Sequence, residues 1–247
     1  MKKIFLTIFL FNSLNLIFGQ EIKLYDENFF LLEKKKKSNP VYFIKNEISE
    51  KSLKEKFYTI KDSTLVKEIN TEKDEVGEIL TQVILKYRPD GEIFQELIKD
   101  NNSGSIVFKN YDTEGQLSYI YEYSRHSKMK SKYFDKENKE ILISSEQLPE
   151  PKDGIMGWQK YLSSNLIYPA EAKSKRLEGD ALISFSITQK GKVENIEILN
   201  PEEIHHSIVK EAYRIANEYP YNWSPYILNE QARVSVMVLP LRFKLGS

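Results

Sequence analysis

The chain has 247 residues, with 36 basic and 36 acidic side chains and a formal net charge of zero. This balance gives no electrostatic reason to expect nucleic acid as a partner, because such proteins carry a basic excess. Cysteine is absent, which excludes disulfides, thiolate catalysis, thiolate metal sites and a lipidated cysteine. The length predicts two domains, and 40% hydrophobic residues suffice for a real core.

The first 19 residues have the pattern of a secretory signal peptide. Lys2 and Lys3 precede an apolar run, Ile4–Phe18, and Gly19 is a small residue suited to cleavage. The alternative is an uncleaved inner-membrane anchor, but three polar residues interrupt a run that is already shorter than the ~20 residues needed to span a bilayer. We therefore expect a cleaved leader and a periplasmic protein.

Residues 20–143 are predicted to form a β-rich repeat domain. Three segments share an aromatic residue, two further residues, an acid, Gly or Asn, and then an aliphatic residue: Tyr87–Ile93, Tyr111–Leu117 and Phe134–Ile141. Gly and Asn tolerate the positive φ of a tight turn, so each copy predicts two strands of a meander. The repeats are similar to those of the YwqK antitoxin-component and MORN type.

Residues 144–153 are expected to be a linker, because two prolines in a polar run favour an extended, semi-rigid chain. The second domain is then 154–247. Its patterns predict first a helix capped by Asp153 and a break at Tyr168-Pro169. Two strands follow, Asp180–Thr188 and Val193–Leu199, then a helix opening at Asn200-Pro201, and finally a last strand, Gln231–Phe243. This α–β–β–α–β order predicts an α+β fold with a small antiparallel sheet.

The order and spacing of five features resemble the C-terminal domain of TonB-family proteins, of the Bacteroidetes type, over about ninety residues. They are Tyr168-Pro169, Glu178-Gly179, the turn at Gly191, Trp223 with Pro225, and the last strand. The resemblance implies that the last strand is a sheet edge and pairs with an extended peptide of an outer-membrane TonB-dependent receptor. The peptide-binding residues expected on this basis are Tyr168, Pro169, Arg233, Val234, Ser235, Val236, Met237, Val238 and Leu239.

Three non-enzymatic functions follow from this resemblance. The first is a periplasmic protein that binds a receptor peptide by strand addition. The second is an energy transducer that keeps its leader as a membrane anchor and contacts the ExbB/ExbD motor. The third is an envelope scaffold that self-associates, for example as a homodimer. No nucleophile elbow, phosphate loop or dinucleotide fingerprint occurs, so neither an enzyme nor a cofactor is expected.

The only sequence cluster suggestive of metal chemistry is His205-His206, preceded by Glu202 and Glu203. Adjacent residues on a helix point about 100° apart, so the two imidazoles cannot share a ligand face. A His–Glu pair at i, i+3, Glu202 with His205 or Glu203 with His206, could hold one ion weakly, but an exposed helical face explains the cluster better. We therefore expect no metal site. The third histidine, His126, is expected in a loop.

Overall fold

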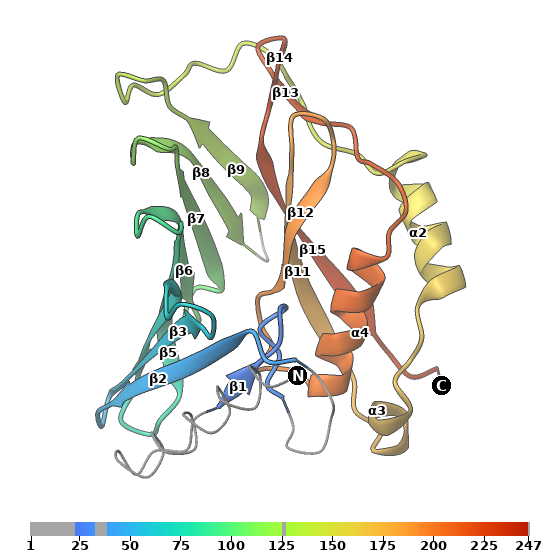
Figure 1. The fold of residues 1–247 in the computed structure, drawn as a ribbon. Coiled ribbons are helices and arrows are strands. Elements are labelled where there is room, and N and C mark those ends of the chain that lie inside the picture. The colour runs from blue at the N-terminus through green and yellow to red at the C-terminus, as the bar shows by residue number, and fades with distance from the viewer. Residues whose placement is uncertain (1–22, 33–38, 125–126, 247) are drawn as a thin grey trace. The chain divides into compact units, whose positions relative to one another are not determined.

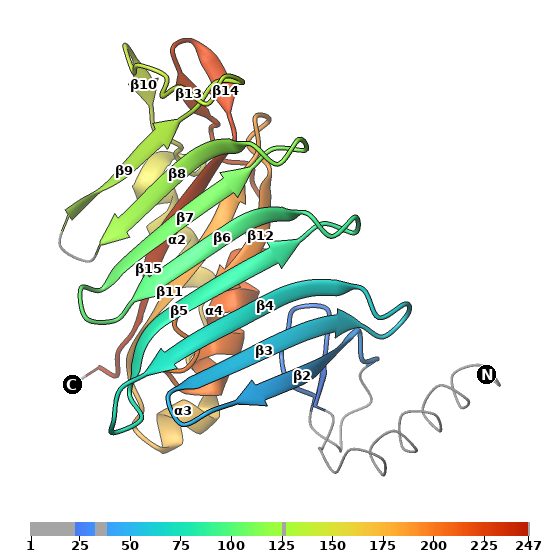
Figure 2. The same ribbon diagram turned by 90° about the vertical axis from the view of Figure 1, so that its left-hand side faces the viewer.

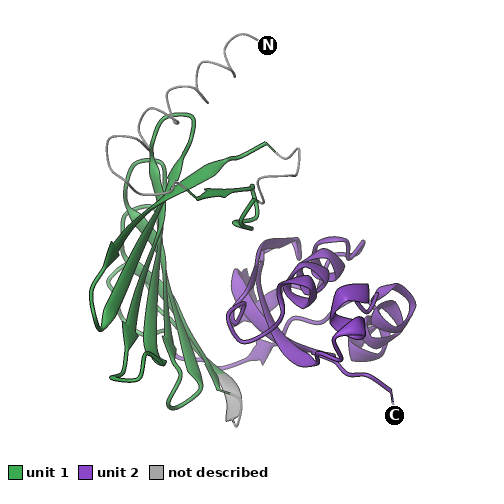
Figure 3. Ribbon diagram, turned by 90° about the horizontal axis from the view of Figure 1, so that it is seen from below, with its two compact units in different colours: residues 1–141 green, residues 142–247 purple. Residues whose placement is uncertain are grey.

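The computed structural model describes residues 23–32, 39–124 and 127–246. The chain divides into two compact units, unit 1 at residues 1–141 and unit 2 at residues 142–247 (Figure 3). The expected leader and His126 lie outside the described residues. A large antiparallel sheet, small sheets and a few helices give the α+β class that the sequence predicts.

Unit 1 is an antiparallel meander in which each strand pairs with the next one in sequence (Figure 2). Its strands are β1 (Leu24–Tyr25), β2 (Tyr42–Ile48), β3 (Ser52–Thr59), β4 (Leu65–Lys73), β5 (Ile79–Tyr87), β6 (Ile93–Asp100), β7 (Ser105–Tyr111), β8 (Leu117–Ser124) and β9 (Ser127–Tyr133). The likeness of its repeats to the YwqK and MORN type stays a prediction.

The predicted turns of unit 1 depend on residues with positive φ and on aspartate side chains. Gly91, Gly115 and Asn138 have φ values of 91°, 78° and 59°. The Asp112 carboxylate accepts hydrogen bonds from the backbone N–H groups of Glu114 and Gln116, each at 2.9 Å. Such a side-chain bond within the turn closes the hairpin locally, so each repeat carries its own folding signal.

A further turn of this kind, between β4 and β5, is absent from the sequence prediction. Asp74 accepts hydrogen bonds from the backbone N–H groups of Val76 and Glu78, and Gly77 has a φ of 90°. Its segment begins with Lys73 where the three predicted copies begin with an aromatic residue. A repeat pattern that requires an aromatic residue at its start therefore does not include this turn.

Unit 2 contains three helices and six strands among the described residues (Figure 1). In chain order they are β10 (Glu146–Gln147), α2 (Gly154–Asn165), α3 (Ala170–Ser174), β11 (Gly179–Ile187), β12 (Val193–Ile198), α4 (His206–Asn217), β13 (Tyr226–Leu228), β14 (Gln231–Arg233) and β15 (Ser235–Phe243). The strand order of the main sheet is β12-β11-β15, and β10-β13-β14 forms a second small sheet. Helix α4 packs against β11 and β12, so one face of the main sheet is covered.

The buried side of α4 follows the helical period, because Ile208, Ala212 and Ile215 are fully buried. The predicted start of this helix is wrong. It begins at His206, and His205 is the N-cap residue. Asn200 makes long-range bonds instead, because its side chain accepts a hydrogen bond from Leu182 N and donates one to the Asp180 carbonyl oxygen, at 2.8 and 2.9 Å. Pairing with β11 thus outweighs the local capping signature.

Residues 144–153 differ from the expected extended linker, because their backbone is bonded within unit 2. β10 pairs with β13. Glu150 N donates to Ser224 Oγ, and Ser224 N donates to the Glu150 carbonyl oxygen, at 2.8 and 2.7 Å. Both prolines of the segment, Pro149 and Pro151, are buried. Residues 144–153 are therefore not a free linker. They form a strap, held to unit 2 by the pairing of β10 with β13 and by the bonds between Glu150 and Ser224.

The predicted cap of α2 also differs. Asp153 does precede the helix, but it has a left-handed conformation, with φ at 61°, and its side chain makes no capping hydrogen bond.

Candidate peptide-docking edge of the C-terminal unit

The candidate site is strand β15, whose residues are mostly Val, Leu and Phe and therefore suit a half-buried sheet. Its whole length pairs with β11, from Gly179 opposite Phe243 to Ile187 opposite Ser235. Since β15 is the end strand of the sheet β12-β11-β15, its other side carries no paired strand among the described residues. An end strand presents a row of N–H and C=O groups to which another strand can add.

The direction of these groups follows from Leu182 in β11. Leu182 N donates to the Asn200 side chain, and its carbonyl oxygen accepts from Leu199 N, so both groups point toward the β12 side. Backbone groups alternate along a strand, so those of Ile183 point toward β15 and pair with Leu239. By the same alternation, the backbone groups of four residues point away from β11, to the side of β15 that carries no paired strand in the described part of the chain. We call this the open side; the residues are Val236, Val238, Pro240 and Arg242.

Pro240 lies in a position that suits this assignment. It pairs opposite Leu182, whose groups point away from β15, so the missing N–H of Pro240 deletes no bond to β11. Proline is tolerated in sheets at such edge positions. It also leaves a gap in the open row of donors, which divides Val236 and Val238 from Arg242.

An aromatic cluster fixes the core beside β11. The Trp223 ring lies 5.2 Å from Phe185 and 6.2 Å from Trp158, between ring centroids. Trp223 N donates to the Gly191 carbonyl oxygen at 2.9 Å. Gly191 has a φ of 79°, and a Cβ added to it would lie 1.9 Å from the Trp223 carbonyl oxygen. The β11–β12 turn therefore accepts only glycine at position 191.

Helix α4 holds the preceding segment through a buried carboxylate. Glu211 accepts hydrogen bonds from Ile167 N at 2.7 Å and from Arg214 Nε at 2.8 Å. Arg214 Nη2 in turn donates to the Asn165 carbonyl oxygen at the end of α2. The hydrogen bond that Arg214 donates to Glu211 raises the pKa of the Arg214 guanidinium above its ordinary value. This network fixes the chain just before Tyr168-Pro169.

Residues 164–245 match the family model of the Gram-negative bacterial TonB protein C-terminal domain. The match lies entirely within unit 2. TonB C-terminal domains interact with TonB-dependent receptors, and the family is generally one of non-enzymatic, envelope-associated transport proteins. No curated protein is significantly similar to the chain. Across the described part of the chain, no helix has the length and apolarity needed to cross a bilayer.

Within this TonB-like segment, the nine predicted binding residues do not form one surface. Ser235, Val236, Met237, Val238 and Leu239 lie together in β15. Arg233 lies outside it, because it ends β14 and pairs opposite Tyr226 of β13. The predicted strand Gln231–Phe243 is therefore two strands, separated at Val234.

Tyr168 and Pro169 lie toward the other end of β15. The Tyr168 ring is 5.9 Å from that of Phe243, and its hydroxyl donates to the Leu177 carbonyl oxygen at 2.6 Å. Burial raises the pKa of this hydroxyl above its ordinary value, and the Glu178 carboxylate adds to the effect. Pro169 is the N-cap residue of α3. In the TonB-like segment these two residues thus anchor α3 beside the last strand.

The TonB-like segment also holds a cluster that sequence reasoning missed. Glu171 of α3 lies beside His205 and His206, and one ligand atom from each residue lies within 4.8 Å of the others. A hydrogen bond from Lys175 lowers the pKa of the Glu171 carboxyl below its ordinary value. Glu202 and Glu203 are the near neighbours of the histidines in sequence, whereas the carboxylate beside them in the structure belongs to Glu171 of α3, 34 residues before His205.

Proposed function

We propose that unit 2 binds an extended peptide segment of an outer-membrane TonB-dependent receptor by strand addition along β15. The observation that carries the proposal is the position of β15 at the end of its sheet, with the backbone groups of Val236 and Val238 on the open side. Main-chain hydrogen bonds supply affinity in this mode, and alternate side chains supply selectivity. The family match supports the class of partner.

The proposed contact surface differs from the stretch inferred from the sequence. The open register comprises Val236, Val238, the carbonyl oxygen of Pro240 and Arg242, whereas Ser235, Met237 and Leu239 direct their backbone groups to β11. A docked peptide would therefore exchange hydrogen bonds with Val236 and Val238 directly. Half-buried Met237 and Leu239 would contribute through their side chains.

The test compares Val238→Pro with Val238→Ala. Both remove the buried valine side chain, but only proline removes the N–H on the open side. We expect the proline variant to bind a receptor-derived peptide about two- to twelvefold more weakly than the alanine variant, which corresponds to one lost hydrogen bond of about 0.5–1.5 kcal/mol. Affinity is measured by calorimetry on variants that circular dichroism shows to be folded.

A second pair avoids the buried core. Arg242 is exposed and forms an ion pair with Asp180 at 3.4 Å, which both Arg242→Pro and Arg242→Ala remove. Its N–H lies on the open register beyond Pro240, so the pair reports whether the peptide extends past that gap. Equal affinity within the Val238 pair would exclude strand addition on β15 as the binding mode.

A further inference from the structure

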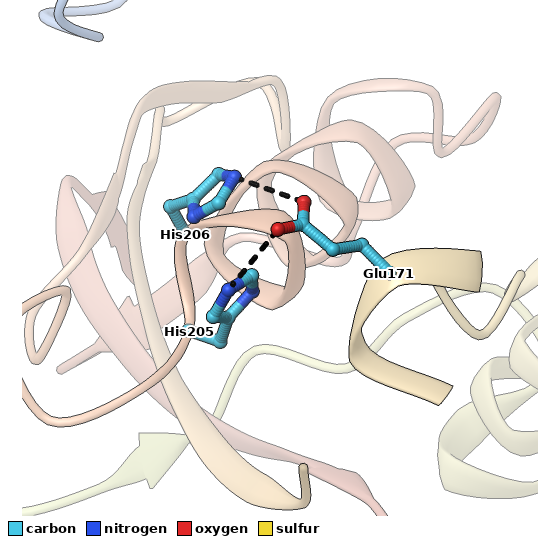
Figure 4. Close-up of side chains that lie close together, drawn as sticks. All are labelled: Glu171, His205 and His206. Atoms are coloured by element: carbon cyan, nitrogen blue, oxygen red, sulfur yellow. Dashed lines mark ion pairs between the residues drawn. The ribbon is translucent and has the colours of Figure 1, made fainter. Parts of the chain in front are cut away.

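The cluster of Glu171, His205 and His206 brings together one metal-ligating side chain from α3 and two from the start of α4 (Figure 4). His205 Nε2 lies 3.6 Å from Glu171 Oε1, and His206 Nε2 lies 3.3 Å from Glu171 Oε2. The two imidazole rings are 4.2 Å apart between centroids. Both rings therefore direct the same nitrogen toward one carboxylate.

The backbone explains why the two histidines can share one ligand after all. His205 is not in the helix: its φ and ψ are −64° and 138°, an extended conformation, and α4 begins only at the next residue. The angular separation of about 100° applies to neighbours within a helix and so does not hold here. The expectation that these imidazoles point apart is wrong for this reason.

The preceding loop is held in place by its own contacts. Asn200 is bonded to the backbone of β11 through Leu182 N and the Asp180 carbonyl oxygen. A Cβ added to Gly179 would lie 2.8 Å from Ile204 Cγ2, so glycine lets the loop pack closely on β11. His205 therefore follows a segment fixed on two sides, and the ligand arrangement does not depend on a free loop.

We propose that Glu171, His205 and His206 bind one divalent ion of the Zn²⁺ class. In a tetrahedral site with Zn–N and Zn–O bonds of about 2.0–2.2 Å, neighbouring ligand atoms lie about 3.3–3.5 Å apart. The two nitrogen–oxygen distances, 3.6 Å to Oε1 and 3.3 Å to Oε2, are close to this separation, so an ion would lie between the two imidazoles and the two oxygens of the carboxylate. Two imidazoles and one carboxylate form a ligand set that suits Zn²⁺.

The surroundings of the cluster leave a fourth position open. The side chains of His206 and Glu171 are 58% and 45% exposed, and that of His205 is 19% exposed. Water, or a donor from a binding partner, can therefore complete the coordination. A site with three protein ligands and an open position is accessible to exchange, unlike a closed structural site.

Ser207 is placed to orient the first imidazole. His205 Nδ1 lies 2.9 Å from Ser207 Oγ and 3.4 Å from Ser207 N. When Nε2 binds a metal ion, Nδ1 carries the ring proton and donates a hydrogen bond to Ser207 Oγ. This bond fixes the tautomer and the orientation of the ring. Without metal, Nδ1 accepts from Ser207 N instead. Ser207 therefore offers a hydrogen-bond partner to Nδ1 both with and without a bound ion.

Lys175 competes with the ion. Its Nζ lies 2.9 Å from Glu171 Oε1, so the ammonium occupies one of the carboxylate oxygens that faces the histidines. A bound ion must displace this contact or share the carboxylate with it. Removing the Lys175 charge should therefore tighten metal binding, a result that a purely structural ion pair would not give.

The experiment titrates Zn²⁺ into the purified full chain, freed of metal by chelation and of any histidine tag, by calorimetry and thermal unfolding. We expect one ion per chain and a rise in the unfolding temperature, because an ion that binds the folded state stabilises it. Glu171→Gln, His206→Ala and His205→Asn should each weaken binding at least about tenfold. Asparagine at 205 retains an N-cap acceptor, so the start of α4 is preserved.

The matched control is Glu194→Gln. Glu194 also pairs with a lysine, Lys192, at 2.9 Å, and has a similar exposure, but no histidine contributes to that pair. It should bind Zn²⁺ like the parent chain, and Lys175→Gln should bind it more tightly. The proposal is overturned if the parent shows no saturable binding. It is equally overturned if the three ligand variants bind as the parent does, since the ion would then lie elsewhere.

Discussion

Unit 1 and unit 2 obtain their sheets in opposite ways. In unit 1 every strand pairs with its neighbour in sequence, and turns close each hairpin locally. In unit 2 the central pair joins residues 179–187 with residues 235–243, across three intervening strands and helix α4. Local pairs can open one at a time, whereas a long-range pair depends on the whole core. Single substitutions should therefore act locally in unit 1 and cooperatively in unit 2.

The largest expected effect tests this contrast at two turn glycines. Gly191 and Gly91 both have positive φ, at 79° and 91°. A Cβ at Gly191 would collide with the Trp223 carbonyl oxygen, whereas a Cβ at Gly91 meets nothing within 4 Å. We expect Gly191→Ala to cost about 5 kcal/mol or more, and Gly91→Ala only the backbone strain of about 1–2 kcal/mol.

Chemical denaturation with tryptophan fluorescence measures the first variant, because Trp158 and Trp223 both lie in unit 2. Hydrogen exchange at the ends of β5 and β6 measures the second. Equal losses for the two alanine variants would show that the close approach at Gly191 carries no stability, and that the two turns differ only in sequence position.

The next effect concerns the Trp223 side chain, which is 5% exposed and packs against Phe185, Trp158 and Tyr219. Trp223→Ala should destabilise unit 2 by about 3–5 kcal/mol, the range for a buried aromatic residue. Trp223→Phe, which retains an aromatic ring, is the control. A loss below about 1 kcal/mol for Trp223→Ala would mean that this cluster does not hold the long-range sheet together.

The features that could be predicted from the sequence are those that depend on neighbouring residues, as in unit 1, rather than on long-range contacts, as in unit 2. Turns in unit 1 depend on neighbouring residues, so Gly91, Gly115 and Asn138 could be identified from their spacing alone. The last strand and the spacing of the buried residues in α4 were predictable because side-chain period is local, whereas the edge position of that strand followed from the family resemblance.

What the sequence could not predict depends on distant partners. Asn200 has a capping signature, but its amide bonds to β11 instead. Pro149 and Pro151 suggest a linker, yet both are buried, and Glu150 between them bonds to Ser224, 74 positions later. Glu171 and His205 are brought together only by the packing of α3 on α4.

The strap at residues 144–153 gives the third prediction. A fragment of residues 142–247 retains β10 and the bonds between Glu150 and Ser224, whereas a fragment that begins at the predicted boundary, 154–247, lacks both. We expect the longer fragment to be more stable by about 2–3 kcal/mol, the sum of several net hydrogen bonds. Urea denaturation of both fragments measures the difference in free energy of unfolding. Identical midpoints and slopes would show that residues 144–153 contribute no stability and act only as a linker.

In unit 1, Asp112→Ala removes the acceptor for Glu114 N and Gln116 N in the β7–β8 turn. We expect a cost of about 1 kcal/mol, confined to that hairpin, because the turn is exposed and its bonds are local. Asp112→Asn retains a side-chain oxygen and should recover most of the loss. Faster hydrogen exchange throughout the sheet, rather than in β7 and β8 alone, would contradict the picture of separable hairpins.

The smallest effect is expected at a fully buried residue of the long-range strand. Ser235 is 0% exposed, and its Oγ has no hydrogen-bond partner among the described residues. Ser235→Ala deletes a desolvated hydroxyl that makes no bond, so the free energy of unfolding should change by less than about 0.5 kcal/mol or rise slightly. Burial alone would suggest a large loss at this position.

Ser224→Ala is the matched control, because the same atoms are removed at an exposed serine whose Oγ accepts a bond from Glu150 N at 2.8 Å. It should cost about 0.5–1.5 kcal/mol, more than the change at the buried serine. Denaturant titration of the two variants in parallel gives the order. If Ser235→Ala were the more damaging, Ser235 Oγ would have a bonded partner in solution, and the start of β15 would depend on a side-chain bond as well as on its backbone pairing with β11.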